Sequence, residues 1–197
     1  MPLPKLVTPE FTVMVPSTKE PIKIRPFLVK EEKVLFIAME GSDANDIEGA
    51  IVNILESCIL TPGVNVKKMP SYDVEYVFLQ LRGKSVGETI KLKMSHGEDT
   101  ECKAVTDVEL NVEEIQVSFN EDHTNKIQIS DDIGIKFRDP SLRDLTSVEV
   151  GDNNYDTVVN VVANCIDMVY DKEDVYDNFT KEECIEFLNN MTQDQFT

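Results

Sequence analysis

The chain contains two histidines and four cysteines, the residue types that most often form zinc sites. His96 and Cys102 flank a predicted tight turn between two strands, as zinc ligands can, and His123 could add a third ligand. A structural zinc site needs four ligands, usually in short-spaced pairs, and the cysteines form no Cys-x-x-Cys pair. An ordinary polar turn therefore accounts for these residues better than a zinc site, and no metal ligand is assigned.

Motifs for catalysis or cofactor binding do not occur in the sequence. It contains no G-x-S-x-G, no P-loop and no G-x-G-x-x-G after a strand. The acidic segments 151–154 and 171–174 lack the twelve-residue spacing and closing Glu of an EF-hand. We therefore predict a protein that is not an enzyme and has no cofactor. The competing interpretation is a metal-dependent hydrolase that uses His96, Cys102 or His123.

The four cysteines also bear on the compartment. They are far apart, and residues 1–5 begin no long apolar stretch of the kind found in signal peptides. No apolar run approaches the roughly 20 residues that span a bilayer. We expect a reducing cytosol, in which Cys58, Cys102, Cys165 and Cys184 are free thiols packed as small hydrophobic side chains.

A protein-binding surface is better supported than a catalytic site, and it is predicted on a helix from Pro70 to Lys84. Val74, Val77, Phe78 and Leu81 recur at i, i+3, i+4 and i+7, which predicts one apolar face toward the core. Tyr and Arg on another face are residue types enriched at binding hot spots. The alternative is that the second face only widens the core stripe. The candidate partner-binding residues are Tyr72, Tyr76, Leu79, Arg82 and Lys84.

The elements around this helix begin with an extended Pro-rich start and a β-hairpin of residues 11–15 and 22–25. Helices follow at 29–39 and, capped by Asp43 or Asn45, up to Cys58. Ser71 can cap the Pro70 helix, and the Arg82–Lys84 stretch is expected to end it. Alternating residues then predict an antiparallel β meander from Glu88 to Phe137, whose strands are 90–94, 102–110, 115–119, 126–129 and 133–137.

Helices return in the last third. They are expected from Ser141 to Leu145, from Asp152 to Tyr170, and after a capping box at Thr180. The predicted class is α+β, with two helical hairpins, a central antiparallel β meander and an N-terminal β-hairpin. Three segments are expected: 1–87, N-terminal hairpin plus helical region; 88–138, antiparallel β region; and 139–197, C-terminal helical region.

One internal repeat is suggested by the helical segments. Residues 50–59 and 157–166 share Val, Asn, Cys and Ile at the same spacing, and a loop and an amphipathic helix follow each copy. The pattern predicts two related helical hairpins around an inserted sheet. The alternative is convergence between two amphipathic helices of similar composition.

Charge limits the kind of partner. The 197 residues carry a formal net charge of −18. Such a surplus of acid argues against nucleic-acid backbones, whose binding needs a Lys/Arg surplus, and against anionic membranes. The acidity either keeps the chain soluble or forms an acidic face for a basic partner.

Two stretches resemble a known family. PFLVKEEKVLFIAME at Pro26–Glu40 and PSYDVEYVFLQLRGKSVGE at Pro70–Glu88 are similar to the baseplate proteins of T4-like contractile-tailed bacteriophages. The resemblance implies a structural or assembly protein of the baseplate hub that binds other hub or tail proteins, with no nucleic acid, membrane or small-molecule substrate. It implies a place in the virion tail baseplate or, for an assembly chaperone absent from the mature virion, in the host cytoplasm during assembly.

Overall fold

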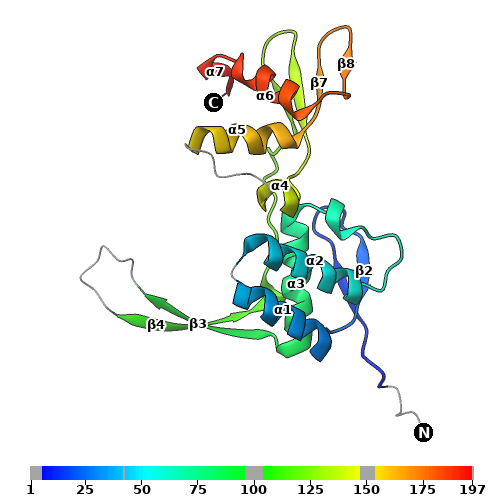
Figure 1. Ribbon diagram of the computed structural model, residues 1–197. Helices are drawn as coiled ribbons and strands as arrows, with labels where there is room; N and C mark the ends of the chain where they lie inside the picture. Colours follow the sequence, from blue (N-terminus) through cyan, green and yellow to red (C-terminus); the bar gives the residue numbers. More distant parts are fainter. Residues whose placement is uncertain (1–5, 42, 96–103, 147–153, 197) are drawn as a thin grey trace. The chain divides into compact units, whose positions relative to one another are not determined.

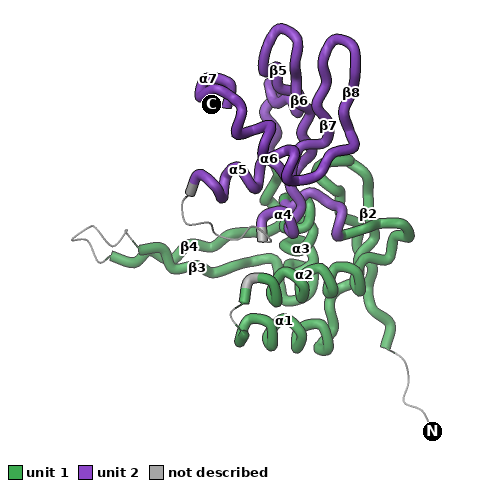
Figure 2. The backbone as a smooth tube through the Cα atoms, turned by 45° about the horizontal axis from the view of Figure 1, so that its top comes forward, with its two compact units in different colours: residues 1–66, 72–117 green, residues 67–71, 118–197 purple. Residues whose placement is uncertain are grey.

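The computed structural model describes residues 6–41, 43–95, 104–146 and 154–196 (Figure 1). Helices and antiparallel sheets are both present, which confirms the predicted α+β class. The chain forms two compact units, coloured separately in Figure 2. Unit 1 comprises residues 1–66 and 72–117, and unit 2 comprises 67–71 and 118–197. The three-segment division of the sequence stays a prediction.

Unit 1 begins with the predicted hairpin, in which Val13 pairs with Ile22. Asp43 caps the second helix by accepting a hydrogen bond from the Asn45 backbone N–H, as expected. The buried centre is formed by side chains of β2, α2 and α3 together with Val112. The elements are β1 (Phe11–Met14), β2 (Pro21–Ile24), α1 (Val29–Gly41), α2 (Ala44–Cys58), the 3-10 turn η1 (Val66–Lys68, shared with unit 2), α3 (Ser71–Val86), β3 (Thr89–Ser95), β4 (Val105–Asn111) and the 3-10 turn η2 (Val112–Glu114).

Unit 2 is built on a four-stranded antiparallel sheet in the order β5-β6-β7-β8. Two helices, α5 and α6, supply the rest of its core, with Val159, Ala163, Cys184 and Leu188 among the buried side chains. The predicted capping box is confirmed, since Thr180 and Glu183 bond each other's backbone N–H groups. The elements are β5 (Lys126–Gln128), β6 (Gly134–Phe137), α4 (Leu142–Thr146), α5 (Asn154–Cys165), β7 (Ile166–Tyr170), β8 (Val175–Tyr176), α6 (Lys181–Asn189) and α7 (Gln193–Phe196).

The single meander predicted for Glu88 to Phe137 is wrong. Its strands divide between two sheets: β3 pairs only with β4, whereas β5 and β6 belong to the sheet of unit 2. Residues 115–119, predicted as a strand, form no strand. Asn111 instead caps η2 by accepting a hydrogen bond from the Glu113 backbone N–H, which turns the chain away from the first sheet.

The predicted end of helix α3 at residues 82–84 is also wrong, because α3 continues to Val86. Gly83 is a point of close approach and not a stop: a Cβ on Gly83 would collide with the buried side chain of Val112. Gln80 donates from Nε2 to the Val112 carbonyl over 2.9 Å. The glycine therefore lets η2 pack directly against the helix.

The helix predicted from Asp152 to Tyr170 ends earlier, at Cys165, and the following five residues form β7. Ile135 of β6 pairs with Val169, so the sheet captures this apolar run as a strand. Ile166–Tyr170 is rich in apolar residues that suit either element, and pairing with β6 decides the outcome.

The two segments predicted as a repeat occupy equivalent places. α2 ends at Cys58, and Ile59 then pairs antiparallel with Ile24 of β2. α5 ends at Cys165, and Ile166 then pairs antiparallel with Phe137 of β6. Each unit therefore runs through a hairpin, two helices, a residue or strand paired to the hairpin, and a further helix.

In the first copy of the repeat, Arg25, the residue directly after β2, joins the hairpin to the start of α1 and the end of α2. Its Nη2 donates to the Glu31 carboxylate and to the Ser57 carbonyl, each over 2.9 Å, and its backbone N–H donates to the Cys58 carbonyl over 2.9 Å. The last turn of α2 contains no basic residue of its own. Arg25 thus supplies the positive charge and the donors that the helix C-terminus lacks.

Arg138, directly after β6, does the same in the second copy. Its Nη1 and Nη2 donate to the two carboxylate oxygens of Asp144 over 2.7 and 2.9 Å. Nη2 also reaches the Asn164 carbonyl over 2.6 Å, and the backbone N–H donates to the Cys165 carbonyl over 2.9 Å. The last turn of α5 likewise has no basic residue. The shared arginine clamp strengthens the interpretation of the two units as copies of one structural unit.

Candidate protein-binding surfaces

Helix α3, the predicted partner-binding helix, lies in the middle of unit 1. Val74, Val77 and Leu81 are buried as predicted, whereas Phe78 is only half-buried. The candidate residues Tyr72, Tyr76, Leu79, Arg82 and Lys84 are all partly covered as well. The helix therefore offers a partner narrow strips of surface, and the binding role of these five residues stays a prediction.

Lys84 already has partners inside unit 1. Its ammonium donates to Glu88 over 2.9 Å and to Glu113, and it lies 5.4 Å from the centroid of the Phe11 ring. The hydrogen bonds to Glu113 and then Glu88 raise the pKa of Lys84. This side chain ties α3 to the residues after β4 and stays positive over the whole physiological pH range.

Asp73 lies in the first turn of α3. It is fully buried. One carboxylate oxygen accepts the Ser17 backbone N–H over 3.0 Å, and the other accepts the Ser17 hydroxyl. The carboxylate thereby ties the β1–β2 turn to the start of α3, a link between residues 56 positions apart.

A more open surface is the ribbon of β3 and β4, which we call the arm. The two strands pair from Thr89–Asn111 to Ser95–Val105 and extend away from the rest of unit 1 (Figure 1). Most of their side chains are exposed. A two-stranded ribbon is at best marginally stable in water unless something packs against it.

The two faces of the arm differ in chemistry. Residues directly opposite in an antiparallel pair lie on one face, and successive residues alternate between faces. Lys91 bonds Glu109 across the polar face over 3.1 Å. The other face is apolar; Leu92 and Met94 on it are 40% and 59% exposed. The apolar residues of this face are Ile90, Leu92, Met94, Val108 and Leu110, and Thr106 lies opposite Met94.

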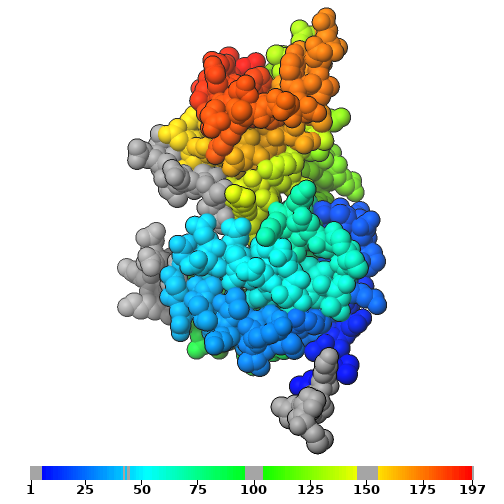
Figure 3. Space-filling view, turned by 45° about the vertical axis from the view of Figure 1, so that its right-hand side comes forward, coloured from blue at the N-terminus to red at the C-terminus, as the bar shows by residue number. Residues whose placement is uncertain are grey.

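Helix α1 presents a second exposed apolar surface. Only Glu31 and Ala38 are buried, while Phe36 and Ile37 are 62% and 58% exposed. Residues 25–65, blue to cyan in Figure 3, form much of the visible face of unit 1. A helix with apolar residues all round it is usually covered on more than one side. Large exposed apolar areas of this kind mark interaction sites in soluble proteins.

The residues considered for chemistry show no site where the structure describes them. His96 and Cys102 lie outside the described residues, and His123 is exposed. No group of three or more potential metal ligands occurs in the described part of the chain. Cys58, Cys165 and Cys184 are buried free thiols, as predicted, and burial raises the pKa of each.

The acidic loop after β7 is closed on itself. The Asp171 carboxylate accepts the backbone N–H groups of Glu173 and Asp174 over 2.8 Å each, and the Tyr176 hydroxyl over 3.1 Å. The backbone bonds from Asp174 and Glu173 lower the pKa of Asp171. This arrangement is a turn held by a charged acceptor.

Comparison with known proteins decides the family. The family model described as T4 bacteriophage base plate protein matches residues 8–197. The chain belongs to this family. The match covers both units, including the second half, where the sequence resemblance was loose. No curated protein and no solved structure gives a match.

Membership of the base plate family assigns the chain a structural role in the phage tail, in contact with other baseplate proteins. It confirms the resemblance inferred from Pro26–Glu40 and Pro70–Glu88. Among the described residues, no helix has the length and apolar character to cross a membrane. The arm and the α1 surface are exposed apolar surfaces of this baseplate protein.

Proposed function

We propose that the chain is a component of the baseplate hub that acts by binding hub or tail proteins, without catalytic turnover. The observation that carries the proposal is the arm. On its apolar face Leu92, Met94 and Leu110 are exposed and Ile90 and Val108 are partly covered, while its polar face is already paired by Lys91 and Glu109. A neighbouring protein that packs on the apolar face would give the ribbon the support that an isolated hairpin lacks.

The other parts of the proposal rest on charge. A net charge of −18 disfavours nucleic acid and anionic membranes, so the partners are proteins and not DNA, lipid or a small substrate. The half-covered face of α3 around Tyr76 and Leu79 is a secondary contact in this proposal.

A second candidate function is that of a dedicated chaperone for hub assembly, absent from the mature virion. The observation in its favour is the strong acidity, since a charged soluble surface can keep an aggregation-prone partner apart from its own kind. Mass spectrometry of purified particles separates the candidates: a hub subunit is present in them, and a chaperone is found only in assembly intermediates.

The arm is tested by a tagged full-length chain expressed in infected cells. Leu92→Thr with Met94→Thr should reduce co-purification of baseplate proteins, because the double substitution removes two large apolar side chains from the apolar face. Covering two half-exposed side chains contributes about 1 kcal/mol each, so the loss should be roughly tenfold or more. Thr is chosen because it retains strand propensity.

The matched control changes the opposite face. Lys91→Thr with Lys93→Thr changes the positions of β3 that precede Leu92 and Met94. Both changes replace exposed polar residues on the opposite face. It should leave co-purification intact, since exposed ion pairs contribute little. Equal recovery with both double variants, or recovery of host enzymes alone, would contradict the proposal.

A further inference from the structure

Unit 2 contains an apolar pocket that the proposed function does not use. Its volume is about 350 Å³, at the small end of ligand-sized cavities. It lies between the end of the sheet and helix α6. The apolar lining includes Ile133, Val169, Tyr176, Phe179, Cys184 and Phe187.

The two copies of the repeat differ at this place. In unit 1, Asp73 in the first turn of α3 hydrogen-bonds Ser17 in the hairpin turn. The residue at the same helical position of α6 is Glu183. Its carboxylate turns back to accept the Thr180 backbone N–H over 2.7 Å and does not reach the β5–β6 turn. Ile133 of that turn lines the pocket and is 36% exposed.

Both carboxylates that line the pocket already have hydrogen-bond partners inside the protein. Asp171 accepts three hydrogen bonds, one of them from the Tyr176 hydroxyl, and Glu183 is held by the capping box. A polar small molecule would therefore meet few groups able to orient it. An apolar side chain needs no such groups and gains from burial alone.

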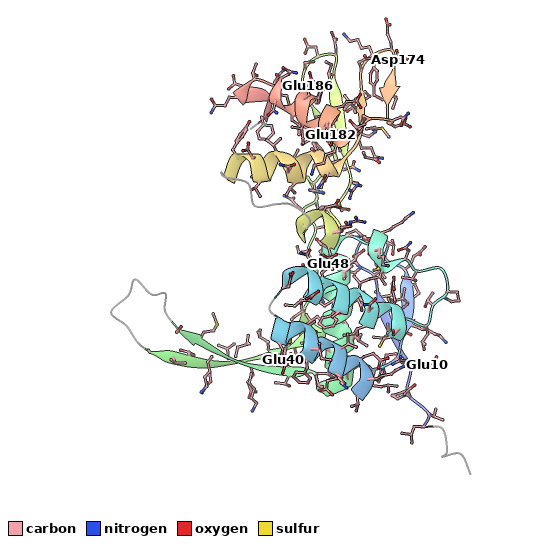
Figure 4. The ribbon with its side chains drawn as sticks, viewed as in Figure 1. Glu10, Glu40, Glu48, Asp174, Glu182 and Glu186 are labelled. Atoms are coloured by element: carbon pink, nitrogen blue, oxygen red, sulfur yellow. The ribbon has the colours of Figure 1, made fainter. Side chains whose placement is uncertain are left out.

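The surroundings of the pocket are acidic. Residues 118–197 contain 18 acidic and 6 basic residues, so this segment carries −12 of the total −18. Figure 4 shows Glu182 and Glu186 on α6 and Asp174 at the turn before β8. These three side chains are exposed, and they lie on the helix and the turn that also contribute residues to the pocket. A partner that enters here meets an apolar hollow in a strongly acidic part of the chain.

We propose that this pocket binds a bulky apolar side chain flanked by Lys or Arg in a segment of a partner protein. The apolar lining takes the anchor, and the acidic surface around the pocket attracts the flanking cations and speeds association. This proposal deepens the proposed function. It rests on that function in one respect, namely that the partner is a protein. It uses a surface separate from the arm.

The test uses the full chain labelled with ¹⁵N and three synthetic pentapeptides: Lys-Lys-Trp-Lys-Lys, the same peptide with Ala for Trp, and Glu-Glu-Trp-Glu-Glu. The first should shift the amide resonances of Tyr176, Cys184 and Phe187. The chain has no tryptophan, so a blue shift of the peptide's fluorescence reports burial of the anchor directly. The other two peptides should bind at least tenfold more weakly.

Two sets of variants locate the binding site. Ile133→Arg places a cation in the lining of the pocket and should abolish binding. Glu182→Lys with Glu186→Lys should weaken it about 2- to 30-fold at low salt, with the effect lost at high salt. The control, Glu10→Lys with Glu40→Lys in unit 1 (Figure 4), makes the same change in net charge and should bind as the wild type does.

Several results would overturn the proposal. They are no shift at the pocket with the Trp peptide, equal binding of the Ala or Glu peptide, and pocket shifts that grow with protein concentration alone, which would mean that a second copy fills it. If Ile133→Arg does not fold, the Glu182 and Glu186 variants decide. Leu92→Thr with Met94→Thr should bind the peptide normally, so failure of the pocket and failure of the arm are distinguishable.

Discussion

The arginine clamp of unit 2 can be tested by replacing Asp144 with Asn. The Asp144 carboxylate accepts two hydrogen bonds from Arg138, and further ones from the Ser141 backbone N–H and hydroxyl. Asn keeps the size but has one acceptor oxygen, and its NH₂ group would face these donors. The clamp would lose its charge and at least one bond, and the start of α4 would lose its anchor.

The size of the effect follows from the pKa of Asp144. Burial raises it, but the hydrogen bonds from Arg138 and Ser141 outweigh burial and lower it from 3.8 to about 2. A difference of that size corresponds to about 2.5 kcal/mol of stability at neutral pH. The Asp144 side chain is 13% exposed but that of Arg138 is 43% exposed, so screening by water reduces this to about 2 kcal/mol.

The assay is urea unfolding of both proteins across a pH series. A carboxyl group with a depressed folded-state pKa stabilises the protein fully above its unfolded pKa of about 3.9, and loses the contribution as pH falls through the folded value. The difference between wild type and Asp144→Asn should therefore be constant from about pH 7 to 5 and fall to roughly half by pH 3. Glu186→Gln, an exposed change in the same unit, should change stability by less than about 0.5 kcal/mol.

The reasoning would be refuted by either of two results. One is that Asp144→Asn unfolds within about 0.5 kcal/mol of the wild type at pH 7, the range of an uninvolved surface change. The other is a difference that does not shrink as the pH approaches 3, because the charge of Asp144 would then not be its source.

Three further substitutions and one ligand removal test other parts of the structure. Gly134→Ala should cost about 1–3 kcal/mol in urea unfolding, because the new Cβ would collide with the Tyr170 ring; an unchanged midpoint would show that the ring moves freely. Leu55→Ala, in the fully buried centre of unit 1, should cost about 2–5 kcal/mol, and a loss below about 1 would contradict its core position. Thr180→Ala should cost about 1 kcal/mol by removing the cap of α6, whereas Thr180→Ser should not. Dialysis against a chelator should leave the thermal midpoint unchanged; stoichiometric zinc with loss of folded signal would show that a metal site was missed.

The features that could be read from sequence are those set by neighbours along the chain. The hairpin of β1 and β2, the Asp43 cap and the Thr180 capping box depend on side chains within a few residues of the backbone groups they bind. The α+β class follows from the change of period between helical and alternating stretches. The family resemblance was likewise present in two short stretches of sequence, and the family model confirms it.

The errors arose where distant residues decide. The run Ile166–Tyr170 continues a helical pattern, yet pairing with β6 makes it a strand. A glycine is typical of a helix end, yet Gly83 lies inside α3. The side chain of Val112 occupies the space that a Cβ at position 83 would fill. In both cases the local preference for one conformation over another is small compared with the free energy of packing against residues more than 25 positions away. The tertiary contact therefore determines the conformation.

The functional surfaces depended even more on tertiary structure. The repeat was visible as matching letters in residues 50–59 and 157–166, but the clamps formed by Arg25 and Arg138 join strands to helix ends across 26 or more positions. Exposure of the arm, partial covering of α3 and the opening beside α6 follow from which surfaces find a neighbour when the chain folds. Periodicity shows that a side chain is apolar and which face it shares; only the packed chain determines whether that face is covered, because burial is a property of the surrounding elements.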